Sequence, residues 1–300
     1  MNNIGFNLLG AVIAFLVFQV IVEGINKLGE QRGVKIDALN KDDFIKKVIK
    51  SKNTVRIMET WTDLLSSNQF LTTFSDAIEA SVRNNNTIFE ILLLNPEDTY
   101  LVKRRQEDLS NNEDVEINIY RSISTIQKIL QNLGNMGKNF QVKLYSRNPS
   151  LAIYMNDDDL FLTFFRANLN TSQGEQLKLP RNSTIGTFII EEMFYEIWED
   201  TKNTKDLNNI VFYCININNK LYDVKYIFQE NVFYIQSSDL TTDSINNNIF
   251  QDTIIEVDDQ QYKLTPEAKR KEDLPLRVQE LFDNKYPTTE DIFFELIKLR

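Results

Sequence analysis

The chain has 300 residues, enough for two domains or one large one, with a formal net charge of -10, one cysteine and no histidine. Without histidine there can be no serine–histidine or cysteine–histidine nucleophile system, histidine general base, phosphohistidine intermediate or histidine-ligated metal. The single cysteine, Cys214, excludes an internal disulfide and a cysteine-rich zinc site, and the acidic balance argues against general nucleic-acid binding.

The N-terminal segment has the features of a membrane anchor. Ile4 to Val22 is a run of 19 residues without a formal charge, just long enough for a helix to cross a bilayer. No basic residue precedes it, and no Ala-x-Ala cleavage site follows, so a signal peptide is disfavoured; a buried core helix is the alternative. We therefore expect a transmembrane helix over 1–25 and a juxtamembrane connector over 26–53.

Basic residues predict the orientation of this anchor. Lys27, Arg32, Lys35 and Lys41 follow the span and none precedes it. By the positive-inside rule the N-terminus faces outward and the remainder is cytoplasmic, which predicts a single-pass protein of the inner (cytoplasmic) membrane of a bacterium.

One side of the anchor carries small and polar residues. Asn7, Gly10 and Ala14 fall on nearly the same helix face, which lets two helices approach and hydrogen-bond. This face predicts a homo-oligomer, with the ordinary composition of membrane helices as the alternative.

Strand and helix signals alternate after residue 53. Apolar, partly β-branched runs predict strands over 54–60 and 87–94, and helical spacing predicts a helix over 70–83 between them. Such a β-α-β unit has parallel, buried strands. Further helices are expected from Asn95, where an N-cap precedes a proline, and over 113–133.

The following segments predict three strands, a polar loop at 169–182 and a strong helix from Ser183. Residues 54–204 are thus expected to form an α/β domain with a mixed sheet flanked by helices, and 205–300 a small α+β domain. The other expected elements are strands over 140–146, 151–155, 160–165, 210–217, 221–228, 232–236 and 253–257, and helices over 275–283 and 288–299.

Two segments resemble known chemical motifs, a phosphate-binding loop and a metal site, but lack residues or geometry that these motifs need. Asn132–Asn139 contains Gly137-Lys138, but asparagines stand where a phosphate-binding loop needs its first glycine and its Ser or Thr. Asp157-Asp158-Asp159 offers hard oxygen ligands, yet three successive turn residues point in different directions, which favours a solvated turn over a metal site.

Residues 54–168 resemble the phospholipase D-like fold. The resemblance is carried by a strand ending in Thr60-Trp61, a helix, the strand ILLLNP with Lys103-Arg104-Arg105 beyond it, and the segment FQVKLYSRNP followed by a strand, an acidic turn and a strand to Asn168. In that family the last stretch carries HxKxxxxD, then Gly-Ser and Asn.

Alignment on Asn168 places Leu151 at the family's histidine, Ile153 at its lysine and Asp158 at its aspartate, so only Asp158 and Asn168 match. The resemblance therefore implies a pseudoenzyme, because the family's nucleophile is the missing imidazole. No catalytic residue, cofactor or metal is expected.

These observations predict a membrane-anchored, non-catalytic binding or scaffold protein. The arrangement is similar to membrane-anchored components of bacterial stress or antiviral defence systems. The alternative is a signal-gated transmembrane effector whose soluble domain senses a small ligand, such as a nucleotide, and clusters to disrupt the membrane. A metal-dependent nuclease that uses carboxylates alone is a third hypothesis. The expected partners are the lipid bilayer and either a second copy or a membrane or cytoplasmic protein, without general nucleic-acid binding.

Overall fold

A computed structural model describes most of the chain beyond the predicted anchor, including the second half of the predicted connector, which holds β1 and α2. The described residues are 35–37, 39–109, 113–148, 151–164, 176–217, 220–247, 253–257, 260–265, 268–287 and 291–299. The predicted helix 1–25, with its association face of Asn7, Gly10 and Ala14, lies outside them, as does Asn168. No helix in the described part is long and apolar enough to cross a membrane.

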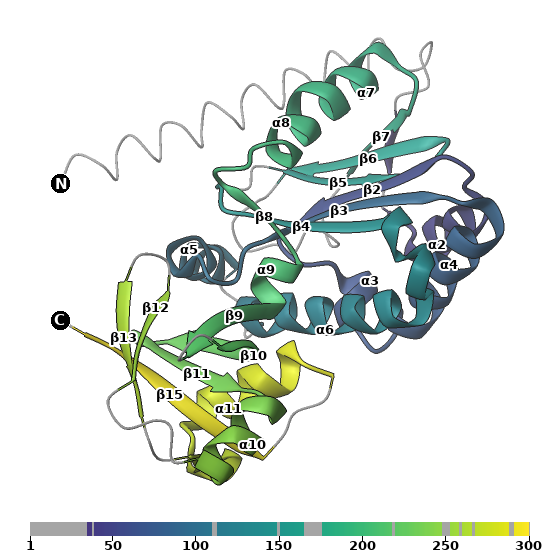
Figure 1. Ribbon diagram of the computed structural model, residues 1–300. Helices are drawn as coiled ribbons and strands as arrows, with labels where there is room; N and C mark the ends of the chain where they lie inside the picture. The colour runs from purple at the N-terminus through teal and green to yellow at the C-terminus, as the bar shows by residue number, and fades with distance from the viewer. Residues whose placement is uncertain are drawn as a thin grey trace, which may run out of the picture.

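The first unit is built on an eight-stranded mixed sheet of order β1-β7-β6-β5-β2-β3-β4-β8 (Figure 1). Its central strands β2, β3 and β4 are parallel, and every other pairing is antiparallel. The strands are β1 (Lys35–Asp37), β2 (Thr54–Glu59), β3 (Ile88–Leu94), β4 (Phe140–Tyr145), β5 (Leu151–Met155), β6 (Asp159–Phe164), β7 (Gln176–Pro180) and β8 (Thr204–Asp206).

Helices cover both faces of this sheet, so the first unit has three layers (Figure 1). On one face lie α2 (Lys41–Lys50), α3 (Asp63–Ser66), α4 (Leu71–Asn85) and α6 (Val115–Leu133), with α5 (Thr99–Leu109) beyond the ends of the parallel strands. On the other lies one continuous run: α7 (Thr184–Phe188), the π-helical turn η3 (Ile189–Phe194) and α8 (Tyr195–Trp198). The predicted mixed sheet flanked by helices is thereby confirmed.

Local sequence signals explain where the helices begin and end. The side chain of Asn40 caps α2 by accepting a hydrogen bond from Asp43 N, and Asp114 caps α6 in the same way through Ile117 N. Helix α6 ends at Gly134, whose φ of 53° suits a residue without a Cβ, and continues as the 3-10 turn η1 (Gly134–Asn139).

Alternating side chains on the parallel strands pack against the two helix layers. Ile57 is opposite Tyr154, which makes an edge contact with Phe44 of α2. Arg56 points the other way: its Nε lies 2.6 Å from Glu90 Oε2, and its guanidinium donates to Tyr195 Oη at the start of α8. Tyr195 hydrogen-bonds to both members of this largely buried ion pair between β2 and β3, and these contacts hold α8 on the sheet. Loss of either charged partner would leave the other charge uncompensated.

The second unit is an antiparallel seven-stranded sheet that curls until its edge strands β9 and β12 approach each other. Its elements are β9 (Phe212–Ile217), β10 (Lys220–Gln229), β11 (Val232–Gln236), α10 (Ser238–Asn247), β12 (Ile254–Val257), β13 (Gln260–Leu264), β14 (Lys269–Arg270), the 3-10 turn η4 (Lys271–Asp273), α11 (Leu276–Lys285) and β15 (Ile292–Lys298). The short helix α9 (Asn208–Val211) leads into it from β8. Strand β8 spans the predicted boundary at 204/205 and pairs with β4.

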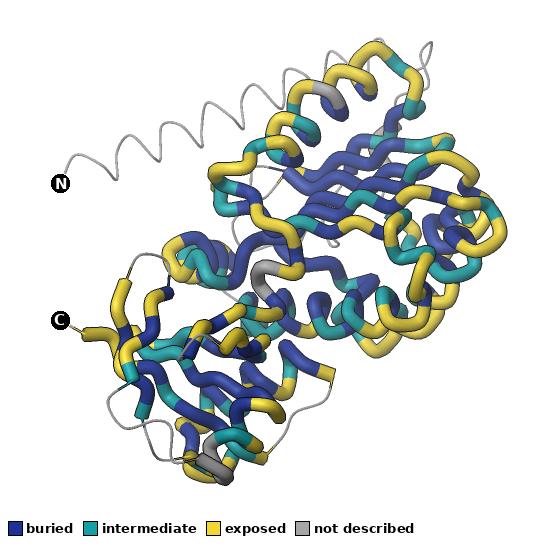
Figure 2. The backbone as a smooth tube through the Cα atoms, viewed as in Figure 1, coloured by how far each residue is buried: buried dark blue, intermediate teal, exposed yellow. Residues whose placement is uncertain are grey.

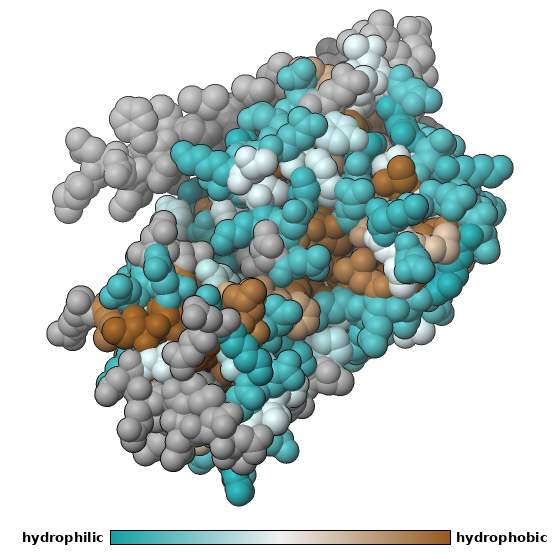
Figure 3. Space-filling model, in the orientation of Figure 1, coloured by the Kyte–Doolittle hydropathy of each residue, from teal (hydrophilic) through white to brown (hydrophobic). Residues whose placement is uncertain are grey.

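Helix α11 joins the two units. It packs on α6 and on β10, and its Val278, Leu281 and Phe282 belong to the same buried cluster as the first sheet. Arg277 pairs with Asp114 and Glu116 at the start of α6, at 2.6 Å from each. Figure 2 shows buried segments on both sides of this junction, and Figure 3 shows apolar surface gathered where the units meet.

Two predicted elements were wrong. Residues 288–299 were expected to be helical, but 292–298 form strand β15. Phe293 packs on Phe282 of α11 while Phe294 lies in the core of the curled sheet, so the strand is apolar on both faces and lacks the alternation that identifies strands. The polar loop expected at 169–182 contains β7, in which Leu177 and Leu179 pair with β6.

Replacing Gly186 with alanine is expected to destabilise the chain. A Cβ there would lie 2.7 Å from Arg181 O and 3.1 Å from Pro180 O, which are backbone atoms of the tight turn before α7. Such overpacking costs about 1–3 kcal/mol, measurable as a lower thermal midpoint. At Gly137 the nearest atom is the flexible Leu130 Cδ2 at 3.3 Å, so Gly137→Ala is the control. Equal midpoints for the two variants would contradict the predicted clash.

Candidate functional site

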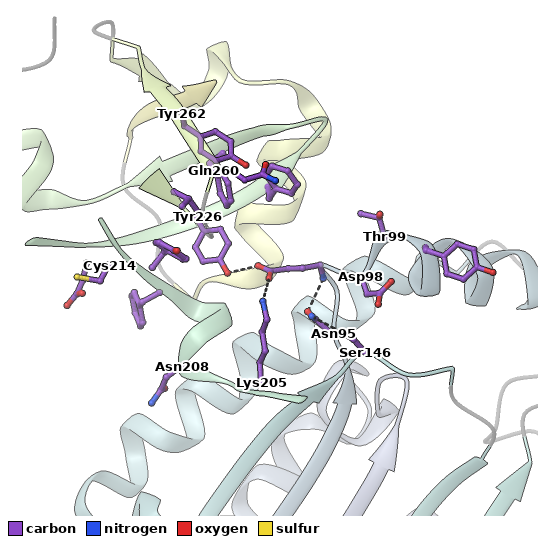
Figure 4. Close-up of a pocket in the computed structure, with 18 residues that line it drawn as sticks. Asn95, Asp98, Thr99, Ser146, Lys205, Asn208, Cys214, Tyr226, Gln260 and Tyr262 are labelled. Carbon is purple, nitrogen blue, oxygen red and sulfur yellow. Dashed lines mark hydrogen bonds and ion pairs between the residues drawn. The ribbon is translucent and has the colours of Figure 1, made fainter. Parts of the chain in front are cut away.

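A large cavity lies between the two units. Its volume is about 1070 Å³, and it opens between the loop after β3 and the mouth of the curled sheet (Figure 4). Crevices at the carboxyl ends of parallel strands and the mouths of curled sheets are both common places for ligands. We call this cavity the inter-unit pocket.

Polar groups from the carboxyl ends of β3 and β4 form one side of it. Asn95, which follows β3, donates through Nδ2 to Ser146 Oγ after β4 at 3.1 Å, and its Oδ1 accepts from Glu97 N at 3.1 Å. Asp98 then caps α5 by accepting a hydrogen bond from Leu101 N at 3.1 Å. The sequence Asn-Pro-Glu-Asp therefore forms a hydrogen-bonded turn from which Glu97 lines the pocket.

Glu97 connects the two units. Its Oε1 accepts a hydrogen bond from Tyr226 Oη of β10 at 2.5 Å, and its Oε2 lies 3.8 Å from Lys205 Nζ of β8 (Figure 4). Lys205 is half exposed and Tyr226 is buried, so the carboxylate lies between solvent and the interior of the second unit.

The opposite side is aromatic. Phe233 of β11 is the centre of the group: its ring centroid lies 4.5 Å from Phe228, 5.1 Å from Tyr262 and 5.8 Å from Tyr226. Tyr213 adds an edge contact with Tyr226 at 6.0 Å. All five residues line the pocket, and we call them the aromatic cluster.

A buried lysine lies behind Tyr226. Lys285, at the end of α11, has no exposed surface; its Nζ donates to Tyr226 O at 2.9 Å and lies 3.8 Å from the centre of the Tyr226 ring. Burial lowers the pKa of Lys285 to about 7, although Glu97 and Glu116 act in the opposite direction. Burial and the neighbouring Glu97 raise the pKa of Tyr226, so its phenol stays protonated and donates to the carboxylate.

The structure separates the positions aligned with the phospholipase D motif. Leu151 and Ile153 are buried in β5, and Ile153 is opposite Met58 on the sheet face beneath η3 and α8. Asp158 is exposed in the turn after β5, and the neighbouring Asp157 accepts hydrogen bonds from Lys52 N and Asn53 N, just before β2. The acidic turn therefore lies at the amino end of β2, at the opposite edge of the sheet from the inter-unit pocket.

The other two aspartates of that turn form ion pairs with basic side chains of neighbouring elements. Asp157 pairs with Arg181, and Asp159 pairs with Lys47 and Lys178. Within the described ranges, no group of three or more Asp, Glu or Cys residues is placed to hold a metal ion.

Nothing in the sequence indicated that the pocket residues lie together in one site. Glu97 was recognised only as an early acidic residue of a helix, and Tyr226 and Phe233 only as members of strands. The one usable signal was the polar run Asn95–Asp98 immediately after a buried strand, because such runs lie at the carboxyl edge of a parallel sheet.

Comparison with known proteins gives weak similarities. No family model and no curated protein matches the chain. Among solved structures, TrmBL2, an archaeal chromatin protein with a novel mode of DNA binding, is 13% identical over 66% of this chain and 66% of its own, with a TM-score of 0.35. Phosphatidylserine synthase from Haemophilus influenzae is 10% identical over 58% of this chain and 38% of its own, with a TM-score of 0.39.

Two expectations from the sequence, the fold family and the absence of nucleic-acid binding, can be compared with these findings. Of the expected phospholipase D-like fold, the structure shows the mixed sheet flanked by helices. The chain spans less than two thirds of either structure's length. The expectation that general nucleic-acid binding is absent is corrected, because the similar solved structures include a DNA-binding chromatin protein.

Proposed function

We propose that the chain is a membrane-anchored, non-catalytic binding protein that holds a small ligand in the inter-unit pocket. The observation that carries this proposal is a cavity of about 1070 Å³ that both units line and that the hydrogen bond from Tyr226 to Glu97 closes at one side. The membrane anchor rests on the uncharged run from Ile4 to Val22.

The pocket has the features of a receptor site. Cavities of about 300–1,000 Å³ with apolar and aromatic linings and a few fixed polar groups are typical of small-molecule sites. Here the aromatic cluster supplies the apolar side, and the turn at Asn95–Asp98 fixes the polar side by its own hydrogen bonds. Because the two sides come from different units, a ligand would contact both.

The proposal of a non-catalytic role rests on the sequence and on β5. Leu151 and Ile153 are buried aliphatic side chains at the positions aligned with the family's histidine and lysine, and the chain contains no histidine that could replace the nucleophile. We therefore expect no phosphodiesterase or lipase turnover. A membrane component of a bacterial stress or antiviral defence system is the setting proposed for this binding role.

Filling the pocket tests the receptor role. Gln260 lines the pocket beside Tyr262, whereas Gln261 is exposed on the opposite face of β13. In detergent-solubilised full-length protein, we expect a metabolite panel to raise the thermal midpoint of the wild type and of Gln261→Trp, but not of Gln260→Trp. A ligand at 100 times its Kd adds about 2.7 kcal/mol. Native mass spectrometry should show a small bound molecule with the same pattern.

Two results would contradict the proposal. Identical ligand responses in Gln260→Trp and Gln261→Trp would place binding elsewhere. Phosphodiesterase turnover that is lost in Asp158→Ala would show that the acidic turn is catalytic.

A further inference from the structure

We propose that the inter-unit pocket selects an organic cation, with an ammonium or guanidinium group seated between Glu97 and the aromatic cluster. This inference rests on the proposed binding function and specifies the chemical class of the ligand. Three independent features of the pocket support it: its charge, its aromatic surface and its size.

The lining is acidic. Glu97, Asp98 and Asp223 line the pocket, and Lys205 is the one basic side chain among the lining residues that the structure describes. Lys205 is already 3.8 Å from Glu97. A phosphate group would meet a net excess of negative charge, whereas a cation is attracted. The charge thus argues against the nucleotide ligand of the effector hypothesis.

The N-terminus of α5 offers no compensating anion site. Its dipole and free amide groups would ordinarily favour an anion, but Asp98 occupies that position and accepts from Leu101 N. The two carboxylates that reach the pocket from this turn therefore leave it acidic.

The aromatic cluster suits the same ligand. Rings attract a cation through their negative faces, and this attraction grows when water is excluded. Phe233 contacts Phe228, Tyr226 and Tyr262, so several rings adjoin at one place opposite the carboxylates. An ammonium or guanidinium group can contact a ring and a carboxylate at once.

Size and ligand geometry exclude a bare metal ion. The cavity of about 1070 Å³ is far larger than one ion, and no described set of acidic or cysteine side chains converges to coordinate one. A charge carried on an organic body fits this volume and uses the apolar side of the pocket.

Calorimetric titration of the detergent-solubilised full chain tests the charge. The probes are spermidine as the cation, ADP as an anion and maltose as a neutral ligand. We expect spermidine alone to bind, more weakly at high salt. Glu97→Gln keeps an acceptor for Tyr226 Oη but removes the charge, and should weaken spermidine binding about 10-fold or more. Glu256→Gln, at an exposed position of β12, is the matched control and should not change it.

A second variant tests the rings. Phe233→Leu keeps an apolar side chain but removes the π-face, and should weaken spermidine binding about 3- to 10-fold, as expected for the loss of a cation–π contact. The thermal midpoint of the variant without ligand shows whether it is folded.

The outcomes separate the two proposals. Binding of ADP or maltose that Gln260→Trp abolishes, without binding of spermidine, would overturn the cation inference and leave the receptor function intact. Spermidine binding that neither Glu97→Gln nor Phe233→Leu weakens would also overturn the inference. If the metabolite panel fails to stabilise the wild type as well, the receptor function itself is overturned.

Discussion

The folded chain should become more stable as the pH rises from about 7 to 9.5. The cause is Lys285, which is fully buried and whose pKa is lowered by burial to about 7. In this pH range the unfolded chain keeps the proton on this lysine and the folded chain releases it. Stability should therefore rise by up to about 1.4 kcal/mol per pH unit, or about 3 kcal/mol over the range, and level off below pH 7.

The surroundings of Lys285 identify it as the source of this slope. Tyr226 of β10, Tyr286 after α11 and Tyr120 of α6 place their rings within 3.8–5.4 Å of Nζ, and Glu97 and Glu116 exert the electrostatic attraction that opposes the shift. The chain has no histidine, so no imidazole adds to the slope near pH 7.

Denaturant unfolding at a series of pH values measures the effect. Lys285→Met keeps the length of the side chain and removes the titrating group, so its stability should be nearly flat between pH 7 and 9.5. Tyr226 O, which loses the lysine donor, still lies 3.0 Å from Tyr286 Oη, whose one proton it shares with Val211 O. Lys128→Met, at an exposed position of α6, should keep the wild-type slope. Equal slopes in wild type and Lys285→Met would refute the assignment.

Phe282→Ala should destabilise both units together. Phe282 is fully buried and packs on Tyr286 and Phe293, in the cluster through which α11 joins the first sheet to the second. Truncating a buried phenylalanine costs about 3–5 kcal/mol. Because this cluster also contains Ile227 and Tyr234 of the second unit, we expect the loss to lower the unfolding midpoint of both units.

Two probes can follow the units separately. Trp61 and Trp198, the chain's two tryptophans, lie in the first unit, and the single cysteine, Cys214, is exposed on β9 of the second and can be labelled. Both signals should change at one denaturant concentration in the wild type. They should shift together in Phe282→Ala and also in Phe89→Ala, a buried phenylalanine of β3. Separate midpoints would instead show that the second unit folds on its own.

The sequence predicted most of the first unit because its signals are local. Asn40 and Asp114 are caps, α6 carries an apolar stripe, and β2 and β3 are short apolar runs at the spacing of a β-α-β unit. Strand β15 was missed because its environment is set by distant residues: Phe293 is covered by α11 and Phe294 by the curled sheet. A strand buried on both faces shows no period of two.

The pocket could not be predicted for the same reason. Glu97 and Tyr226 are 129 positions apart, and neither type of residue at its position in the chain indicates a partner. What joins them is the packing of α11 between α6 and β10, which depends on the shapes of both units. Sequence reasoning identified the motif positions Leu151, Ile153 and Asp158 instead, because a linear pattern is visible without the fold.

The position of β15 in its sheet has a consequence for synthesis. The strands of the first sheet are all present once residue 206 has left the ribosome, so that sheet can pair while the second unit is still being made. The second sheet cannot be completed by then, because β15, which pairs with β11, β13 and β14, is the last strand described. Until residue 285 emerges, α11 cannot cover the apolar surface of α6, so the nascent chain exposes an aggregation-prone surface for several seconds.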